Sequence, residues 1–223
     1  MIQRIKSSVL EKKYLTKDVL LLRFERPKDF LYEAGQFVNI RIEEEGKMRM
    51  KAYSILSNSK SETLDFCIKL VDDGFAGNKF KKCEVGDEFE IVGPFGQFKF
   101  LGKTKNHFFI GAGTGIAPLH SIIFDKVDEH FNFSLLMSYK KKEDVLFDLE
   151  FKELEKRDNF KYDVTLTRDD WNGLTGRVQN HLNISIDDTT FYICGLKELV
   201  LDTKDFLISK GVKPEFIQVE RYS

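Results

Sequence analysis

The first hundred residues alternate between short apolar runs and polar turns. Within residues 36–42, Asn39 and Arg41 alternate with Val38, Ile40 and Ile42, which is the two-residue period of a strand with one buried face. Six runs of this kind, separated by turn residues, predict a six-stranded antiparallel β-barrel. The expected strands are residues 2–10, 19–26, 36–42, 50–56, 63–70 and 88–92.

The pattern changes after Gly102, where strand periods alternate with helical ones. The helical spacing of Leu146, Leu149 and Leu154 is one example. Strict alternation predicts a parallel sheet with helices on both faces, and therefore two domains, residues 1–101 and 102–223. The expected strands are 107–110, 133–139, 162–167, 191–194 and 216–219, and the expected helices are 118–127, 145–157, 177–182 and 197–210.

Composition narrows the function. The chain has 223 residues, and its formal net charge of −1 argues against nucleic acid as the main partner. Cys67, Cys83 and Cys194 form no CxxC pair, so no zinc or iron–sulfur site is expected, and sparse cysteines fit a reducing cytoplasm. No run approaches the ~20 apolar residues of a membrane helix. We therefore expect a cytoplasmic protein with no membrane span and no resident metal.

A glycine loop, Ile110-Gly-Ala-Gly-Thr-Gly-Ile-Ala-Pro118, lies between a buried strand and a helix. Glycines here let backbone N–H groups approach a pyrophosphate, which the helix N-terminus also favours. The even glycine spacing departs from GxGxxG, and residues 140–142 after the next strand are basic rather than acidic. By itself the loop indicates a nucleotide site, and a ligand-free strand–helix turn explains it equally well.

Six short motifs follow one another along the chain, and each alone is also explained by packing or by a barrel corner. They are residues 35–38 (GQFV), 51–54 (KAYS), 86–87 (GD), 93–96 (GPFG), 111–115 (GAGTG) and 194–195 (CG). In this order they resemble the ferredoxin–NADP⁺ reductase superfamily in its compact bacterial flavodoxin/ferredoxin reductase-like form. The resemblance spans essentially the whole chain.

The resemblance implies a flavin-binding barrel followed by a nicotinamide-dinucleotide domain. It implies an enzyme that takes a hydride from NADPH or NADH onto bound FAD and passes electrons to an acceptor. FAD is favoured over FMN because most of the family uses it. Since the chain has no cluster cysteines, the acceptor is expected to be external: ferredoxin, flavodoxin or a small molecule.

By the same resemblance, Tyr53 would stack on the flavin ring, Ser54 would hydrogen-bond its reactive nitrogen, and Lys51 would face the flavin phosphates. An aromatic stack contributes roughly 0.5–1.5 kcal/mol beyond its burial. The remaining flavin contacts implied are Ala52, Ile68, Lys69, Leu70, Gly74, Ala76, Gly77 and Asn78.

The flavin motifs depart from the family pattern at two positions. Lys51 stands where an arginine is usual, which keeps the charge and loses the bidentate fork. Gly77 stands where a serine is usual, which removes a hydroxyl. Arg49 or Lys69 could supply the missing phosphate contact.

For the dinucleotide, the resemblance implies that Gly113, Thr114 and Gly115 hold the pyrophosphate and that Cys194 and Gly195 lie near the nicotinamide. Chain order brings Cys194 to the same sheet edge as the glycine loop, because both follow the carboxyl ends of strands. A buried structural cysteine is the other reading of Cys194.

The penultimate residue, Tyr222, matches the aromatic residue that covers the flavin in several relatives, and a frayed terminus is the alternative. Lys140, Thr167, Arg168 and Arg177 resemble a 2′-phosphate pocket, which favours NADPH, although solvated surface cations explain them equally well. We expect Ser54, Cys194 and Tyr222 to carry the catalytic roles.

Two other functions remain open at this point. One is an electron-transfer subunit that works only inside a larger redox complex. The other is a non-catalytic nucleotide sensor, which would bind NAD(P)H without turnover.

Overall fold

The computed structural model describes residues 1–44, 46–71, 74–182 and 185–222, and the chain divides into two compact units. The first unit holds Met1–Lys99 together with His120–Asp125. The second holds Phe100–Leu119 and the chain from Lys126 onward. No helix among the described residues is long and apolar enough to cross a membrane.

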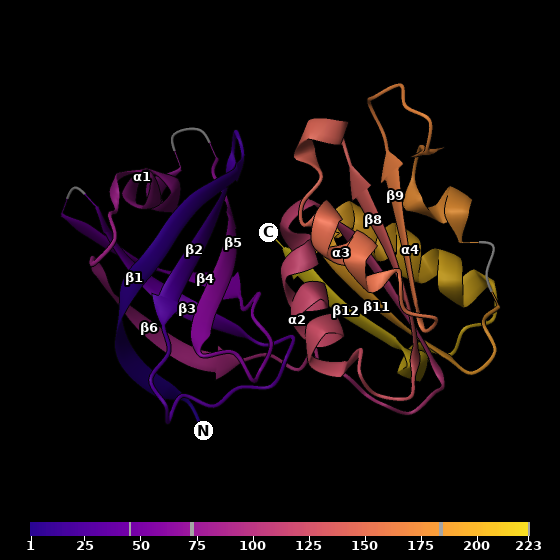
Figure 1. The fold of residues 1–223 in the computed structure, drawn as a ribbon, viewed down its shortest axis with the longest axis horizontal. Helices are drawn as coiled ribbons and strands as arrows, with labels where there is room; N and C mark the ends of the chain where they lie inside the picture. Colours follow the sequence, from indigo (N-terminus) through magenta and orange to yellow (C-terminus); the bar gives the residue numbers. More distant parts are fainter. Residues whose placement is uncertain (45, 72–73, 183–184, 223) are drawn as a thin grey trace. The chain divides into compact units, whose positions relative to one another are not determined.

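The first unit is a six-stranded antiparallel sheet that curls into a half-barrel, which confirms the predicted fold class (Figure 1). Its strand order is β4-β3-β6-β1-β2-β5. The strands are β1 (Gln3–Thr16), β2 (Val19–Glu25), β3 (Phe37–Glu44), β4 (Lys47–Ser54), β5 (Thr63–Lys69) and β6 (Glu88–Phe95).

The core of this unit follows the alternation read from the sequence. Val38, Ile40 and Ile42 of β3 are fully buried, in one cluster with Phe24 and Phe66. The strand β1 runs six residues past its predicted end at residue 10, because its polar second half still pairs with β2. The hydrophobic pattern of residues 11–16 did not predict this extension, because these side chains are partly or fully exposed and show no buried face.

A short helix, α1 (Phe75–Lys82), lies near one end of the curled sheet in Figure 1. Its Phe80 is fully buried against Phe89 of β6, with ring centroids 5.6 Å apart. The apolar pattern of residues 75–82 is too short to predict a helix, so this element became visible only in the structure.

The second unit is a six-stranded sheet in which every neighbouring pair is parallel, as predicted. Its strand order is β10-β9-β8-β7-β11-β12. The strands are β7 (Asn106–Ala112), β8 (Asn132–Tyr139), β9 (Phe160–Leu166), β10 (Leu174–Thr175), β11 (Thr189–Leu196) and β12 (Ile217–Tyr222).

Helices cover both faces of this sheet (Figure 1). On one face, Val200 and Leu207 of α4 pack against Phe191 and Ile193 of β11. On the other, Phe151 of α3 stacks on Phe160 of β9 and makes a tilted ring contact with Tyr162. The helical elements are η1 (Gly113–Gly115), α2 (Ile116–Lys126), η2 (Lys142–Asp144), α3 (Asp148–Leu154), η3 (Val178–His181), α4 (Lys197–Ser209) and η4 (Pro214–Phe216).

Two helices predicted for the second unit differ from the structure. One was predicted too long, and the other is a 3₁₀ turn rather than an α-helix. The expected helix 145–157 is reduced to α3, because Phe147 adopts a left-handed backbone (φ 57°) that interrupts it. Leu149, one of the leucines at helical spacing, is 83% exposed, and Phe151 is buried. The expected helix 177–182 is the 3₁₀ turn η3, and the two-residue strand β10 before it was not foreseen.

Candidate functional site

In the first unit, the KAYS motif forms the end of β4, which is an edge strand exposed over most of its length. Lys51 and Ala52 are exposed, Tyr53 is half-buried and Ser54 is buried. Because side chains alternate along a strand, Arg49, Lys51 and Tyr53 share one face of β4. This part of β4 therefore presents two cations and an aromatic ring in a row.

Tyr53 is held by an edge contact with Phe80 of α1, with ring centroids 5.6 Å apart and planes at 77°. Burial raises the pKa of its phenol above the usual range, so the hydroxyl stays neutral at physiological pH. The ring is thus fixed by packing, while part of it stays accessible for a flat partner.

The start of α1 offers an anion site beside this row. Among the residues that the structure describes, no side chain caps the N-cap Gly74, and no acidic residue occupies the first turn. A β-carbon on Gly74 would lie 2.9 Å from the Val71 carbonyl oxygen, so the turn requires glycine. Free N–H groups at a helix start suit phosphate oxygens, and the site therefore fits the phosphates of a flavin nucleotide.

Three other predicted flavin contacts are less available than expected. The side chains of Ile68 and Leu70 are buried in the core, so only their backbone groups could reach a ligand. The ammonium group of Lys69 forms an ion pair with Asp18. At the helix, Ala76 and Asn78 are half-buried and Gly77 is buried.

The loop that follows Ser54 is held by residues that the sequence did not reveal. The Tyr32 hydroxyl contacts the Ser57 carbonyl at 3.1 Å, and the Ser121 hydroxyl donates to the same oxygen at 2.6 Å. The backbone N–H of Ser59 donates to Asp125 at 3.0 Å. These partners lie 25 to 66 residues away along the chain, so no local signal could reveal them.

In the second unit, the three glycines of the loop are required for different reasons. A β-carbon on Gly115 would lie 2.4 Å from the carbonyl oxygen of Cys194, and one on Gly111 would lie 2.8 Å from a methyl of Leu119. Gly113 instead has open space around it and a φ of +54°. Gly111 and Gly115 therefore permit close packing, while Gly113 sets the direction of the backbone.

The resulting turn fits a dinucleotide pyrophosphate. Ala112 precedes η1 with no side-chain cap, and the described first turns of η1 and α2 contain no acidic residue. Thr114 is half-buried at the centre of η1. Backbone N–H groups at this point are free to meet an anion.

Cys194 is fully buried near the end of β11, where it is paired with Gly111 of β7 and Glu220 of β12. Burial raises the pKa of its thiol well above the usual range, the Glu220 carboxylate raises it further, and a hydrogen bond with Tyr222 opposes both. The thiol is therefore neutral. Glu220 was missed from the sequence, because the pairing of β11 with β12 cannot be read locally.

Tyr222 is the last residue of β12 and is paired with Leu196, so this residue belongs to the sheet rather than to a frayed tail. Its side chain is half-buried. Ser54 belongs to the first unit, whereas Cys194, Gly195 and Tyr222 belong to the second. Each group is thus assembled within its own unit.

Of the residues predicted to bind a 2′-phosphate, three are joined through the backbone at the ends of β8 and β9. The N–H of Arg168 donates to the Lys140 carbonyl at 2.9 Å, and the N–H of Thr167 donates to Tyr139 at 3.0 Å. Arg177 is turned to the Asp202 carboxylate of α4, 3.1 Å away. That ion pair is exposed, so it is weak.

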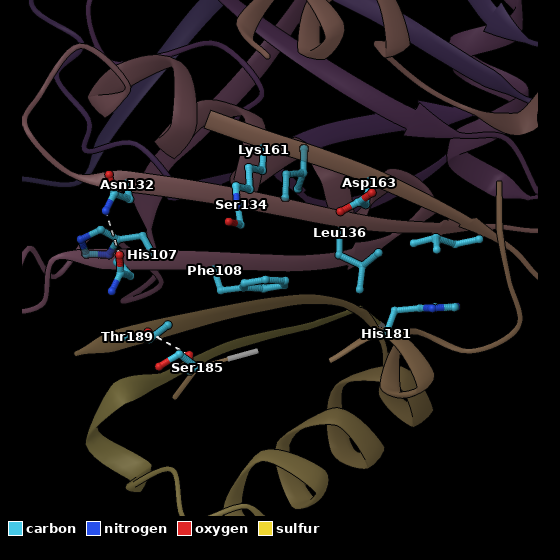
Figure 2. A pocket seen from close by; sticks show the side chains of 13 residues that line it. His107, Phe108, Asn132, Ser134, Leu136, Lys161, Asp163, His181, Ser185 and Thr189 are labelled. Atoms are coloured by element: carbon cyan, nitrogen blue, oxygen red, sulfur yellow. Dashed lines mark hydrogen bonds between the residues drawn. The ribbon is translucent and has the colours of Figure 1, made fainter. Parts of the chain in front are cut away.

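A cavity of about 390 Å³ opens on the α4 side of the parallel sheet (Figure 2). Asn132 and Thr189, the first residues of their strands, lie at one end of it, and Asp163 and His181 lie at the other. No predicted site residue lines this cavity. The candidate nucleotide site instead follows the carboxyl end of β7.

A curled antiparallel sheet with an aromatic–cation row, followed by a parallel sheet with a phosphate-type glycine turn, defines a flavoprotein oxidoreductase. The sequence matches the oxidoreductase FAD-binding domain over residues 6–100 and the oxidoreductase NAD-binding domain over residues 109–205. The chain belongs to the ferredoxin–NADP⁺ reductase superfamily and is an NAD(P)H-dependent flavoprotein oxidoreductase that uses FAD.

Three relatives illustrate the similarity. Ferredoxin–NADP reductase B of Sorangium cellulosum (strain So ce56) is 30% identical over 220 residues, which cover 90% of each chain. The gamma subunit of sulfhydrogenase 1 of Pyrococcus furiosus is 28% identical, over 92% of this chain and 75% of that one. The crystal structure of a ferredoxin NADP⁺ reductase from Neisseria gonorrhoeae with bound FAD and NADP has a TM-score of 0.86 and 24% identity, over 98% of both chains.

Proposed function

We propose that this protein passes electrons from NADPH through FAD to an external carrier protein of the ferredoxin or flavodoxin type in the cytoplasm. The bound FAD and NADPH together supply the redox chemistry. The observation that supports the proposal is the packing of Gly115 on the Cys194 carbonyl, because it keeps the glycine loop beside the cysteine. One dinucleotide can therefore contact both.

The proposal assigns flavin binding to residues 1–101 and dinucleotide binding to residues 102–223. Tyr53 contacts the flavin ring, and Ser54 supplies a hydroxyl that can donate or accept a hydrogen bond. Gly113 and Gly115 bind the pyrophosphate. In this proposal the nicotinamide meets the neutral thiol of Cys194, which is fully buried here and becomes accessible when its hydrogen-bond partner Tyr222 moves aside.

Turnover with separate acceptors tests this function. The purified chain is mixed with NADPH, and reduction of ferricyanide, a bacterial ferredoxin and a flavodoxin is followed in parallel. We expect turnover with ferricyanide and saturable reduction of at least one carrier protein. A protein that binds NADPH but turns over with none of the three is a nucleotide sensor instead.

The choice of NADPH rests on Lys140, Thr167 and Arg168, which the sheet brings together, with Arg177 able to leave its exposed ion pair with Asp202. Steady-state kinetics with both donors test it. A kcat/KM at least tenfold higher for NADH than for NADPH contradicts the assignment.

The second candidate is an electron-transfer subunit of a larger redox complex. It is favoured by the similarity to the gamma subunit of sulfhydrogenase 1 and to a subunit of the Na⁺-translocating NADH-quinone reductase of Haemophilus ducreyi, of which this chain spans only 38%. Purification of the tagged protein from its native cell distinguishes the two. Stoichiometric redox partners that survive gel filtration support the role within a complex.

A further inference from the structure

The cations of β4, Arg49 and Lys51, lie at different distances from Tyr53. These distances can be compared with the positions of the two phosphates in a flavin nucleotide. Along a strand, Lys51 lies about 7 Å from Tyr53, and Arg49 lies about 14 Å from it. FMN ends at the phosphate nearest its ring, and FAD continues through a second phosphate into adenosine. With the ring at Tyr53, as in the proposed function on which this inference rests, Arg49 is placed to meet the half that only FAD possesses.

Arg49 is held at the start of α1 by a contact with Phe75, the first residue of that helix. Its guanidinium carbon lies 4.9 Å from the centre of the Phe75 ring, which is cation–π distance. Lys82, the last residue of α1, forms an ion pair with Glu44, which is paired with Lys47, so none of these contacts engages Arg49. Arg49 is thus the cation of β4 beside the uncapped helix start.

The other candidate cation is already engaged. Lys69 is paired with Asp18, whereas neither Arg49 nor Lys51 forms an ion pair with a carboxylate in the described part of the chain. The planar fork of an arginine can donate two parallel hydrogen bonds to one phosphate, which a lysine cannot do.

We propose that Arg49 is the residue that selects FAD over FMN, by donating its fork to the phosphate on the adenosine side at the start of α1. Lys51 then serves the phosphate that both flavins share. In this assignment the arginine fork comes from the position two residues before Lys51, on the same face of β4.

The test is flavin binding by the full chain after its flavin has been removed. FAD and FMN are titrated separately, and quenching of flavin fluorescence gives each Kd. The variants are Arg49→Gln, Arg49→Lys and, as matched control, Lys47→Gln, which removes the same charge from the same face of β4 toward the far end of α1. Thermal unfolding of each flavin-free variant verifies that it is folded.

For Arg49→Gln we expect the FAD Kd to rise about tenfold or more, because charge-assisted hydrogen bonds are lost, and the FMN Kd to change less than about twofold. Arg49→Lys should recover only part of the FAD affinity. Lys47→Gln should change both Kd values less than about threefold, as expected of an exposed charge at longer range.

Equal weakening of FAD and FMN, or an unchanged FAD Kd in Arg49→Gln, overturns the role of Arg49 while leaving the proposed function intact. An equal loss of FAD affinity in Lys47→Gln also overturns it, because general electrostatics then explain the effect. A parent chain that binds neither flavin refutes both this inference and the proposed function.

Discussion

The glycine turn before α2 and the glycine turn at the start of α1 differ in what surrounds their glycines. The turn before α2 is constrained by packing most strongly at Gly115, where an added β-carbon would meet the backbone of Cys194, and less at Gly111, where it would meet the side-chain ends of Leu119 and Met137. In the turn before α1, a β-carbon on Gly74 would also meet backbone, the Val71 carbonyl oxygen, at 2.9 Å, whereas an added β-carbon on Gly77, inside the helix, would have its nearest atom at 3.4 Å. Beside this helix start lie Arg49 and Lys51 of the exposed strand β4, the cations that we propose meet the flavin phosphates. The comparison teaches that both turns need glycine for close backbone packing, and that the proposed flavin site adds cations from a neighbouring strand.

The largest effect is expected from Gly115→Ala in the packed turn. The added carbon would lie 2.4 Å from backbone, which cannot rotate away, so the Cys194 segment must shift. We expect the free energy of unfolding to fall by about 2–3 kcal/mol and the KM for NADPH to rise at least tenfold. Differential scanning calorimetry and steady-state kinetics measure the two effects.

The control is Gly113→Ala, where the space is open and only the positive φ is strained. It should cost about 1 kcal/mol. If Gly113→Ala is the more damaging variant, packing does not set the shape of this turn.

The next effect concerns Cys194. Replacing it with alanine leaves a small void at the proposed nicotinamide site and leaves the first unit untouched. We expect flavin reduction by NADPH, followed by stopped flow, to slow on the order of tenfold while bound FAD stays stoichiometric. Tyr222→Ala should instead alter flavin fluorescence and the apparent affinity for NADPH. Parent-like kinetics in both variants would refute these roles.

Acid should affect the second unit through His107. This residue is 1% exposed, and burial lowers the pKa of its imidazole to about 4, against partial opposition from the Thr104 backbone and Asp188. The unfolded chain binds a proton as pH falls below about 6.5, and the folded chain does so only near pH 4. Stability is therefore lost between these values, by about 2 kcal/mol or more for this group.

Denaturant unfolding from pH 7 to pH 4, followed by tryptophan fluorescence, tests this expectation, because the single tryptophan, Trp171, lies in the second unit. His107→Phe keeps a ring among the neighbouring aromatic rings of Phe100 and Tyr192 and removes the titration. The variant should show a flatter dependence of stability on pH. An unchanged slope would mean that other groups cause the acid sensitivity.

The smallest effect is expected from Gly77→Ser in the first turn of α1, and it is a gain in FAD affinity rather than a loss. The new β-carbon would meet the Val71 carbonyl at 3.4 Å, which a slight shift can accommodate, and the hydroxyl would add a donor at the proposed flavin phosphates. We expect FAD to bind about two- to fivefold more tightly, as for one additional hydrogen bond of modest net strength. Weaker FAD binding would show that packing around Gly77 leaves no room for the serine side chain.

Sequence alone determined the two architectures and located the glycine turn before α2 between a strand and a helix. The two-residue period in β3 and the alternation of strands with helices after Gly102 reflect which side chains must be buried. This pattern can be read from residues that are close together in the sequence. The order of the six motifs also led directly to the superfamily. The helix 145–157 was overextended because apolar spacing does not reveal the left-handed Phe147.

Only the tertiary structure decided which residues meet. The parallel pairing of β12 with β11 brings Glu220 and Tyr222 to Cys194, and the antiparallel sheet places Asp18 against Lys69. Sequence alone also could not separate Gly115, needed for contact with the Cys194 carbonyl, from Gly113, needed for its φ. Contacts of this kind join residues that lie tens of positions apart in the sequence. Strand register and side-chain packing determine these contacts, whereas the local period of burial determines only which element a residue belongs to.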